Sequence, residues 1–223
     1  MCGIFGLIHP DCKRNSEALI RMSQSLIHRG PDDKGMYFFP TAALGHRRLN
    51  VIDLKTGSQP MLTEDKQIGI TFNGEIYGYR DIKKQLSYAF QTSSDTEVIL
   101  ALYRKYGSHL MQHLPGMFSF ALWDDKKQKL FCARDRFGEK PFYYAIGKNN
   151  EFIFSSEIKA ILASGLISDE IHKPSLKHYL KRLYIHPHET IYKHIKSLPP
   201  GKILEFSSQR IEIKKYWEPP VNE

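Results

Sequence analysis

The order of apolar and polar positions predicts a chain in which strands outnumber helices. Residues 3–8 form an unbroken apolar run, which is typical of a buried strand. Residues 15–27 instead repeat apolar side chains at helical spacing, from Ala18 to Leu26, and predict a helix. The next segments with the pattern of strands lie near residues 36–39, 42–46, 49–53 and 67–72.

The middle of the chain predicts two helices followed by a hairpin. Residues 79–88 and 95–106 have helical periodicity, and the second helix is preceded by the capping-box pattern Ser94-x-x-Glu97. A polar turn then separates two apolar segments, as in a β-hairpin. The two strands of the hairpin are expected at 117–124 and 128–135. Two further strands at 140–146 and 152–155 and a short helix over 157–163 should follow.

The last quarter predicts one helix and two strands. The helix carries an apolar stripe from Leu176 to Leu183, and a Pro-Pro-Gly turn leads into strands 203–206 and 211–216. Along the whole chain, consecutive strands adjoin without helical crossovers. This order indicates an α+β fold, with antiparallel sheets and with helices on their outer faces.

Composition is that of a globular protein, with 41% hydrophobic and 25% charged residues among 223. No apolar run approaches the roughly 20 residues that span a bilayer, and the start lacks the pattern of a signal peptide. We therefore expect no membrane partner. The three cysteines are widely spread, which favours a reducing cytoplasm over a disulfide framework.

The net charge of +8 raises the question of nucleic-acid binding. Basic residues gather in the predicted late helix, at Lys177, Lys181 and Arg182, but no nucleic-acid-binding motif accompanies them. We expect a solvated helix face or a docking surface there, and no nucleic-acid partner. The pair His186-x-His188 lacks nearby cysteines or paired carboxylates, so no metal site is expected.

Cys2 carries the strongest chemical signal. If Met1 is removed, a thiol nucleophile and a free α-amine lie on one residue. An α-amine has a pKa of about 8, so a useful fraction is neutral at pH 7 and can accept a proton. Cys2 could therefore combine the nucleophile and the base of a hydrolase in a single residue.

Four other residues have structural as well as chemical explanations. Asn73-Gly74 after an apolar run is a strong hairpin signal. Arg48 could be a surface arginine on a strand, and Arg47 beside it should then point to the opposite face. Asp95 suits the first turn of a helix.

Several short motifs accompany Cys2 in a fixed order that extends over nearly the whole chain. They are MCGIFG at 1–6, HRGPDDKG at 28–35, GHRRLNVID at 45–53, NGEIY at 73–77, SDTE at 94–97, GMFSFA at 116–121, ARDRFGEKP at 133–141 and LPPG at 198–201. In order and spacing they resemble the N-terminal glutaminase domain of glutamine-hydrolysing asparagine synthetases. These enzymes are class II glutamine amidotransferases, within the N-terminal-nucleophile hydrolases.

The resemblance implies a four-layer αββα sandwich and a set of site residues. Cys2 would attack the side-chain amide of glutamine, and Asn73 and Gly74 would form the oxyanion hole. Arg48 would bind the substrate α-carboxylate, and Glu75 and Asp95 would face its α-ammonium. The backbone at Val51 would also touch the substrate.

The resemblance also implies what lies outside this chain. Residues 1–165 are the expected glutaminase body, and residues 166–223 an extension leading to a synthetase domain. The phosphate-loop motif of that domain is absent from the sequence. We therefore expect no cofactor here, with ATP and Mg²⁺ needed by the synthetase alone. The expected partners are L-glutamine and a synthetase domain or subunit, and a homodimer stays open. The alternative is a non-catalytic or partner-dependent docking domain.

Overall fold

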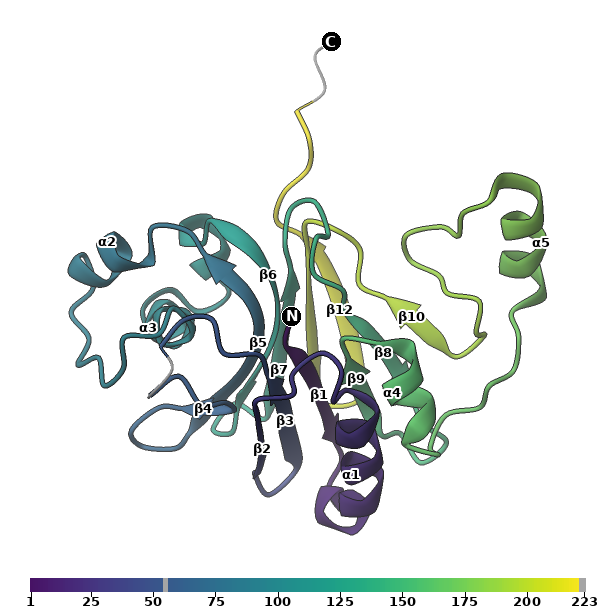
Figure 1. Ribbon diagram of the computed structural model, residues 1–223, viewed down its shortest axis with the longest axis horizontal. Coiled ribbons are helices and arrows are strands. Elements are labelled where there is room, and N and C mark those ends of the chain that lie inside the picture. Colours follow the sequence, from purple (N-terminus) through teal and green to yellow (C-terminus); the bar gives the residue numbers. More distant parts are fainter. Residues whose placement is uncertain (54–55, 221–223) are drawn as a thin grey trace.

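The computed structural model describes residues 1–53 and 56–220, whose strands form two antiparallel sheets (Figure 1). The first sheet has the order β10 (Ile195–Ser197), β8 (Tyr143–Ile146), β9 (Phe152–Ser155), β1 (Gly3–Ile8), β3 (Ala42–Arg48) and β2 (Asp33–Phe38). The second has the order β12 (Arg210–Lys215), β11 (Lys202–Ser207), β7 (Lys129–Arg134), β6 (Gly116–Asp124), β5 (Ile68–Ile76) and β4 (Met61–Leu62).

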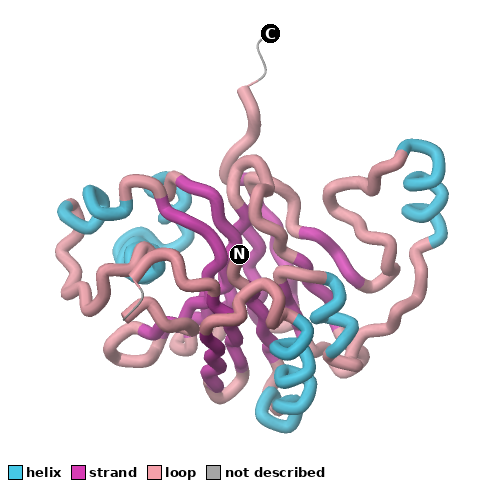
Figure 2. The backbone as a smooth tube through the Cα atoms, in the orientation of Figure 1, coloured by secondary structure: helices cyan, strands magenta, loops and turns pink. Residues whose placement is uncertain are grey.

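Helices lie on the outer face of each sheet, as Figure 2 shows. Next to the first sheet lie a 3₁₀ turn η1 (Cys12–Asn15), α1 (Ser16–Ser25) and α4 (Ile158–Ala163). Next to the second lie α2 (Tyr79–Lys84), α3 (Thr96–Tyr106) and the 3₁₀ segment η2 (Gly107–His113). The helix α5 (Lys173–Arg182) stands apart from the sheets at one side of the molecule (Figure 1).

Alternation along the strands explains the layers. On β1, Ile4 and Ile8 enter the cluster between the sheets, whereas Phe5 and Leu7 pack against α1 and α4. In the second sheet, Trp123 of β6 faces the centre, and its neighbour Leu122 belongs to the cluster under α3. Successive strand side chains point to opposite faces, so each sheet is covered on both sides. The expected α+β fold, a four-layer αββα sandwich, is confirmed.

Most predicted elements are confirmed within a few residues. The strand at 3–8, the hairpin of β6 and β7 and the late strands β11 and β12 are present. The predicted helix at 15–27 corresponds to η1 and α1, and that at 95–106 to α3. The helix expected over 79–88 ends earlier, at Lys84.

The predicted strand at 49–53 is wrong, because no neighbouring strand extends far enough to pair with it. β3 ends at Arg48, and its partners extend no further, since β1 begins with Gly3 opposite Arg47 and β2 with Asp33 opposite Arg48. The next backbone N–H groups bond to side chains instead. That of Leu49 donates to Cys2 Sγ, and that of Asn50 donates to a carboxylate oxygen of Asp32.

The predicted capping box is also wrong. The N-cap of α3 is Asp95, and the hydroxyl of Ser94 accepts the N–H of Thr96, two residues on. The Glu97 carboxylate turns toward the preceding loop, where it accepts the N–H groups of Gln91 and Thr92 at 2.8 Å each. Serine and aspartate compete for such local bonds, and the tertiary fold selects among them.

The segment after residue 166 supplies strands to both sheets, β10 to the first and β11 and β12 to the second. The division of the chain at residue 165 stays a prediction. Within α5, the expected apolar stripe is largely uncovered. Leu180 is 71% exposed and Leu183, just after the helix, is 79% exposed.

Candidate active site

A cavity of about 210 Å³ lies where β1 begins and β3 ends, between the first sheet and β5 of the second. Strand ends, a central stretch of β5 and the residues 51–52, 57, 59 and 94–96 all contribute to it. The lining residues are Met1, Cys2, Arg48, Leu49, Val51, Ile52, Gly57, Gln59, Phe72, Asn73, Gly74, Glu75, Ser94, Asp95, Thr96, Met117 and Lys140. All seven candidate site residues from the sequence therefore lie around one cavity.

Cys2 directs its half-buried thiol into this cavity, beside Leu49. The amide N–H of Leu49 donates to Cys2 Sγ over 3.4 Å, and the thiol lies 3.7 Å from the carbonyl oxygen of the same residue. Burial raises the pKa of the thiol above its ordinary value. The Leu49 N–H, the N-terminal ammonium and Arg48 oppose this rise without cancelling it. The thiol is therefore mostly protonated at neutral pH and needs a base to become a nucleophile.

Asn73 and Gly74 lie inside β5, opposite Ser119 and Phe118 of β6, so they do not form a hairpin turn. The buried side-chain nitrogen Nδ2 of Asn73 has no hydrogen-bond partner among the described residues. Such a buried donor is costly unless something binds it. A Cβ at position 74 would lie 2.2 Å from the backbone oxygen of Met117, so glycine is required there.

Arg48 occupies the last position of β3 and is 5% exposed. Its Nη2 donates to the backbone oxygens of Ile52 (3.1 Å) and Asp53 (2.5 Å), which fixes the guanidinium at the cavity wall. Gly57 leaves room for it, since a Cβ there would lie 2.5 Å from the same nitrogen. Arg47 points away, as predicted, and its Nε donates to the backbone oxygen and hydroxyl of Ser23 in α1.

Two carboxylates, those of Glu75 and Asp95, also line the cavity. Asp95 is 3% exposed, and its Oδ2 accepts the backbone N–H of Ile76 at 3.0 Å. Burial raises the pKa of Asp95. Backbone hydrogen bonds from Ile76 and Thr96 lower it, and the nearby charge of Glu75 raises it further. This pair of acids forms an anionic wall suited to a cation.

Val51 lines the cavity from the loop after β3 and is 72% exposed.

Sequence reasoning missed Gln59 and Lys140, which also line the cavity. The Gln59 amide accepts the N–H of Phe72 (2.7 Å) and donates to the oxygen of the same residue (3.1 Å). It thereby takes the place of a neighbouring strand beside Asn73. No sequence pattern signals this contact, because the fold alone brings residues 59 and 72 together.

Lys140 lies near the end of the turn at 134–141, which Asp135 and Arg134 hold together. Asp135 is 1% exposed, and its carboxylate accepts the N–H groups of three residues of the turn, Phe137, Glu139 and Lys140. Arg134 donates to the backbone oxygens of Gly138 and Lys140. These bonds fix the turn, which brings Lys140 to the cavity.

Within 1–53 and 56–220, no group of three or more His, Cys, Asp and Glu side chains is arranged to hold a metal ion. No helix in the same ranges is long and apolar enough to cross a membrane.

Comparison with known proteins identifies the family. The model of the glutamine amidotransferase domain matches residues 1–217. The chain belongs to the class II glutamine amidotransferases. This amidotransferase domain is 38% identical to asparagine synthetase [glutamine-hydrolysing] 3 of Bacillus subtilis, over 97% of this chain and 36% of the relative. It is 34% identical to asparagine synthetase [glutamine-hydrolysing] 2 of Arabidopsis thaliana, over 99% of this chain and 34% of the relative.

A solved structure supports the fold. Glutamine phosphoribosylpyrophosphate amidotransferase of B. subtilis, in complex with ADP and GMP, superimposes with a TM-score of 0.70 at 18% identity. The match covers 97% of the amidotransferase domain and 49% of that chain. The domain thus spans about half the length of this structure and about a third of the two curated relatives.

Proposed function

We propose that this domain hydrolyses L-glutamine to L-glutamate and ammonia through a thioester at Cys2. The observation that carries the proposal is the juxtaposition in one cavity of the Cys2 thiol and the buried amide nitrogen of Asn73, which has no hydrogen-bond partner in the described part of the chain. A nucleophile beside a free hydrogen-bond donor is what acyl transfer requires, because charge develops on the carbonyl oxygen as the thiolate attacks.

The raised pKa of the Cys2 thiol calls for a base within reach. In the sequence, the nitrogen of Cys2 is part of the peptide bond to Met1, so it has no basic lone pair until Met1 is removed. Once free, this amine takes the thiol proton, and the thiolate attacks the amide carbon of glutamine. The protonated amine then gives its proton to the departing nitrogen, and ammonia leaves. Water hydrolyses the γ-glutamyl thioester, which releases glutamate and restores the thiol.

The cavity also offers groups for both ends of a free amino acid. The oxyanion would accept bonds from Asn73 Nδ2 and from the backbone N–H of Gly74. The fixed guanidinium of Arg48 suits the α-carboxylate, since its planar fork matches two oxygens. Glu75 and Asp95 suit the α-ammonium, and the backbone at Val51 would also touch the substrate.

The released ammonia would serve an amide synthetase. The two curated relatives described above are named as glutamine-hydrolysing asparagine synthetases, and this domain spans about a third of each. We place the consuming reaction in a synthetase domain or subunit outside the 223 residues, and assign ATP and Mg²⁺ to that part. The final ammonia acceptor would be aspartate or a related carboxylate.

One observation favours a second candidate, a docking role in which hydrolysis depends on a partner. The apolar residues of α5 and its end are unusually exposed, with Leu180 and Leu183 above 70%. Exposed apolar groups of this kind occur at surfaces that meet another domain. The intact set of cavity residues nevertheless favours catalysis.

The test is the release of glutamate and ammonia from L-glutamine by the purified domain. Active protein should begin at Cys2 by intact mass. Cys2→Ala should release neither product, and Asn73→Ala should keep the fold while kcat falls about 100–1000-fold. Equal rates for Cys2→Ala and wild type, or full activity with Met1 retained, would contradict the mechanism. Activity that appears only after addition of a synthetase would instead support the docking role.

A further inference from the structure

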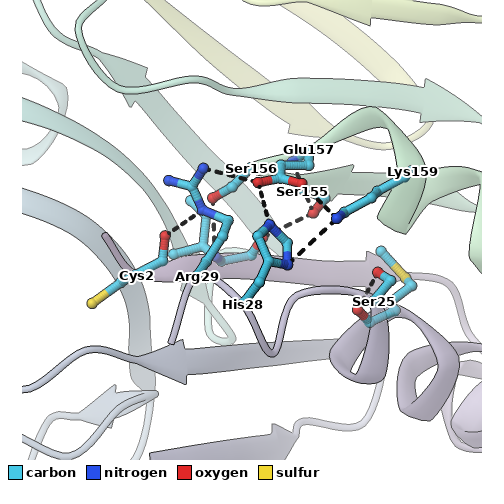
Figure 3. A network of polar contacts seen from close by, with 10 residues as sticks. Cys2, Ser25, His28, Arg29, Ser155, Ser156, Glu157 and Lys159 are labelled. Carbon is cyan, nitrogen blue, oxygen red and sulfur yellow. Dashed lines mark hydrogen bonds and ion pairs between the residues drawn. The ribbon is translucent and has the colours of Figure 1, made fainter. Parts of the chain in front are cut away.

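The backbone of Cys2 is held from outside the cavity. Arg29, which is 8% exposed, donates from Nε to the carbonyl oxygen of Cys2 at 2.8 Å (Figure 3). Removal of Met1 leaves this oxygen intact, so the contact persists in a chain that begins at Cys2. Of the groups on Cys2, the thiol faces Leu49 and the carbonyl faces Arg29.

Arg29 is in turn held by Glu157, at the start of α4. Oε1 of Glu157 lies 3.1 Å from Arg29 Nη1 and 2.9 Å from His28 Nε2, and Oε2 lies 3.4 Å from Lys159 Nζ (Figure 3). Among the described residues, Glu157 is the one carboxylate within ion-pair distance of Arg29. Burial raises the pKa of Glu157, but the hydrogen bonds from His28 and Arg29 outweigh this effect and hold it below its usual value.

The residues just before Glu157 hold the next part of β1. The hydroxyl of Ser156 accepts the N–H of Ile4 at 3.0 Å, and the N–H of Ser156 donates to the Ile4 oxygen at 2.9 Å. The hydroxyl of Ser155 donates to that same oxygen at 3.1 Å. Both serines are fully buried. Residues 155–157 thus fix the chain on both sides of Gly3.

We propose that Glu157 is a positioning residue for the nucleophile, acting through Arg29 on the carbonyl of Cys2. A chain terminus frays unless it is tied down, and rotation about the N–Cα bond of Gly3 would swing the Cys2–Gly3 peptide plane and, with it, the thiol and α-amine of Cys2. The anchored carbonyl prevents this rotation and keeps both groups aimed at the same point in the cavity. This inference rests on the proposed function, although Glu157 itself does not line the cavity.

The test compares Glu157→Gln and Glu157→Ala with wild type, by two readouts. The first is kcat and KM for glutamine hydrolysis. The second is the pH profile of Cys2 alkylation by iodoacetamide, which needs no glutamine. Glu170→Gln and Glu170→Ala are matched controls, because Glu170 also pairs with a lysine and a histidine, Lys193 and His194, away from Cys2.

A misplacement of about 1 Å can cost roughly 100-fold in rate, so we expect kcat to fall about 100-fold in Glu157→Ala. Glu157→Gln retains the shape of the side chain and a hydrogen bond to Arg29, so its kcat should fall only about tenfold. KM should stay within about threefold of the wild-type value, since the groups that would bind the two ends of the substrate are unchanged. The alkylation midpoint should move up by about half a pH unit as the thiolate loses the Leu49 N–H. The Glu170 variants should match wild type.

Two results would overturn the inference. One is a Glu157→Gln protein, folded by circular dichroism, whose alkylation profile and kcat both match wild type. The other is a Glu157 variant in which only the melting temperature falls or only KM rises. The contact would then be merely structural, or a matter of substrate binding. If wild-type protein hydrolysed no glutamine, the proposed function would fail, and the alkylation profile alone would still decide the role of Glu157.

Discussion

Arg47 and Arg48 are one position apart on a strand, yet one has a structural contact and the other lies at the candidate site. They are adjacent on β3, yet Arg48 lines the cavity and Arg47 bonds to Ser23 of α1. Their opposite directions follow from the two-residue period of a strand, so the sequence was sufficient to predict them. The pair therefore provides a matched control for the proposed carboxylate site.

We expect Arg48→Ala to raise the KM for glutamine about tenfold to 150-fold, because a charge-assisted hydrogen bond contributes about 1.5–3 kcal/mol. Arg47→Ala should leave KM within about twofold, while melting temperature reports any loss of its contact with α1. Steady-state kinetics of both variants check this. A rise in KM for Arg47→Ala alone would require a different residue to bind the α-carboxylate.

His46, two residues before Arg48, should make the stability of the fold depend on pH. It is fully buried, and its Nδ1 lies 3.0 Å from the hydroxyl of Thr71. Burial, together with the nearby charge of Arg48, lowers the pKa of His46 to about 3. In the unfolded chain its pKa is about 6.5, so between these values the unfolded state binds the additional proton.

The free energy of unfolding should therefore fall as pH drops below about 6.5. The contribution of His46 between pH 6.5 and pH 4 is about 3 kcal/mol, at 1.36 kcal/mol per pH unit. Urea unfolding of wild type and His46→Gln at several pH values measures it. The variant should lose less stability over this range, whatever its stability at pH 7. Parallel pH curves for the two proteins would show that His46 is protonated in the fold.

At the scale of elements, the sequence pattern predicted the helices and hairpins that depend on neighbouring residues alone. The helix α3 and the β6–β7 hairpin follow from apolar periodicity, and they lie within a residue or two of the predicted bounds. The strand expected at 49–53 failed because pairing depends on where β1 and β2 begin, which no local pattern records. The capping box failed for a similar reason, since Glu97 bonds to a loop fixed by the tertiary fold.

Gln59 acts as a short substitute for a strand along the edge of β5. Replacing it by alanine would leave the buried N–H and C=O of Phe72 without partners, at a cost of about 1–3 kcal/mol for each group. We expect Gln59→Ala to unfold at lower urea concentration and to lower kcat by displacing Asn73. Gln24→Ala, at an exposed position of α1, is the control and should change neither. Wild-type stability in Gln59→Ala would show that water replaces the amide fully.

At the scale of the whole molecule, the cavity joins positions from residue 1 to residue 140, carried by both sheets. Periodicity predicted the sheets but gave no information on which strand ends would meet. The seven candidate residues were instead predicted from the ordered motifs and the family that they resemble. Residues without such a motif role, such as Gln59 and Glu157, became apparent only from their contacts.

The fold as a whole also sorts the three cysteines. Cys12 packs under the first sheet with α1, and Cys132 lies between the two sheets; both are fully buried. Burial raises the pKa of each of these thiols, most strongly that of Cys132. The pKa of Cys2 is also raised, but its thiol faces the cavity, beside the N–H of Leu49 and within the influence of Arg48.

We therefore expect native protein to take up a single equivalent of iodoacetamide, at Cys2, because alkylation requires a thiolate that the reagent can reach. Native Cys2→Ala should take up none, and unfolded wild type should take up three. Peptide mass spectrometry locates the modified residues, and excess glutamine should slow the reaction at Cys2 if the cavity binds it. Modification of Cys12 or Cys132 at a rate similar to Cys2 in native protein would mean that the sandwich opens to solvent far more often than its packing implies.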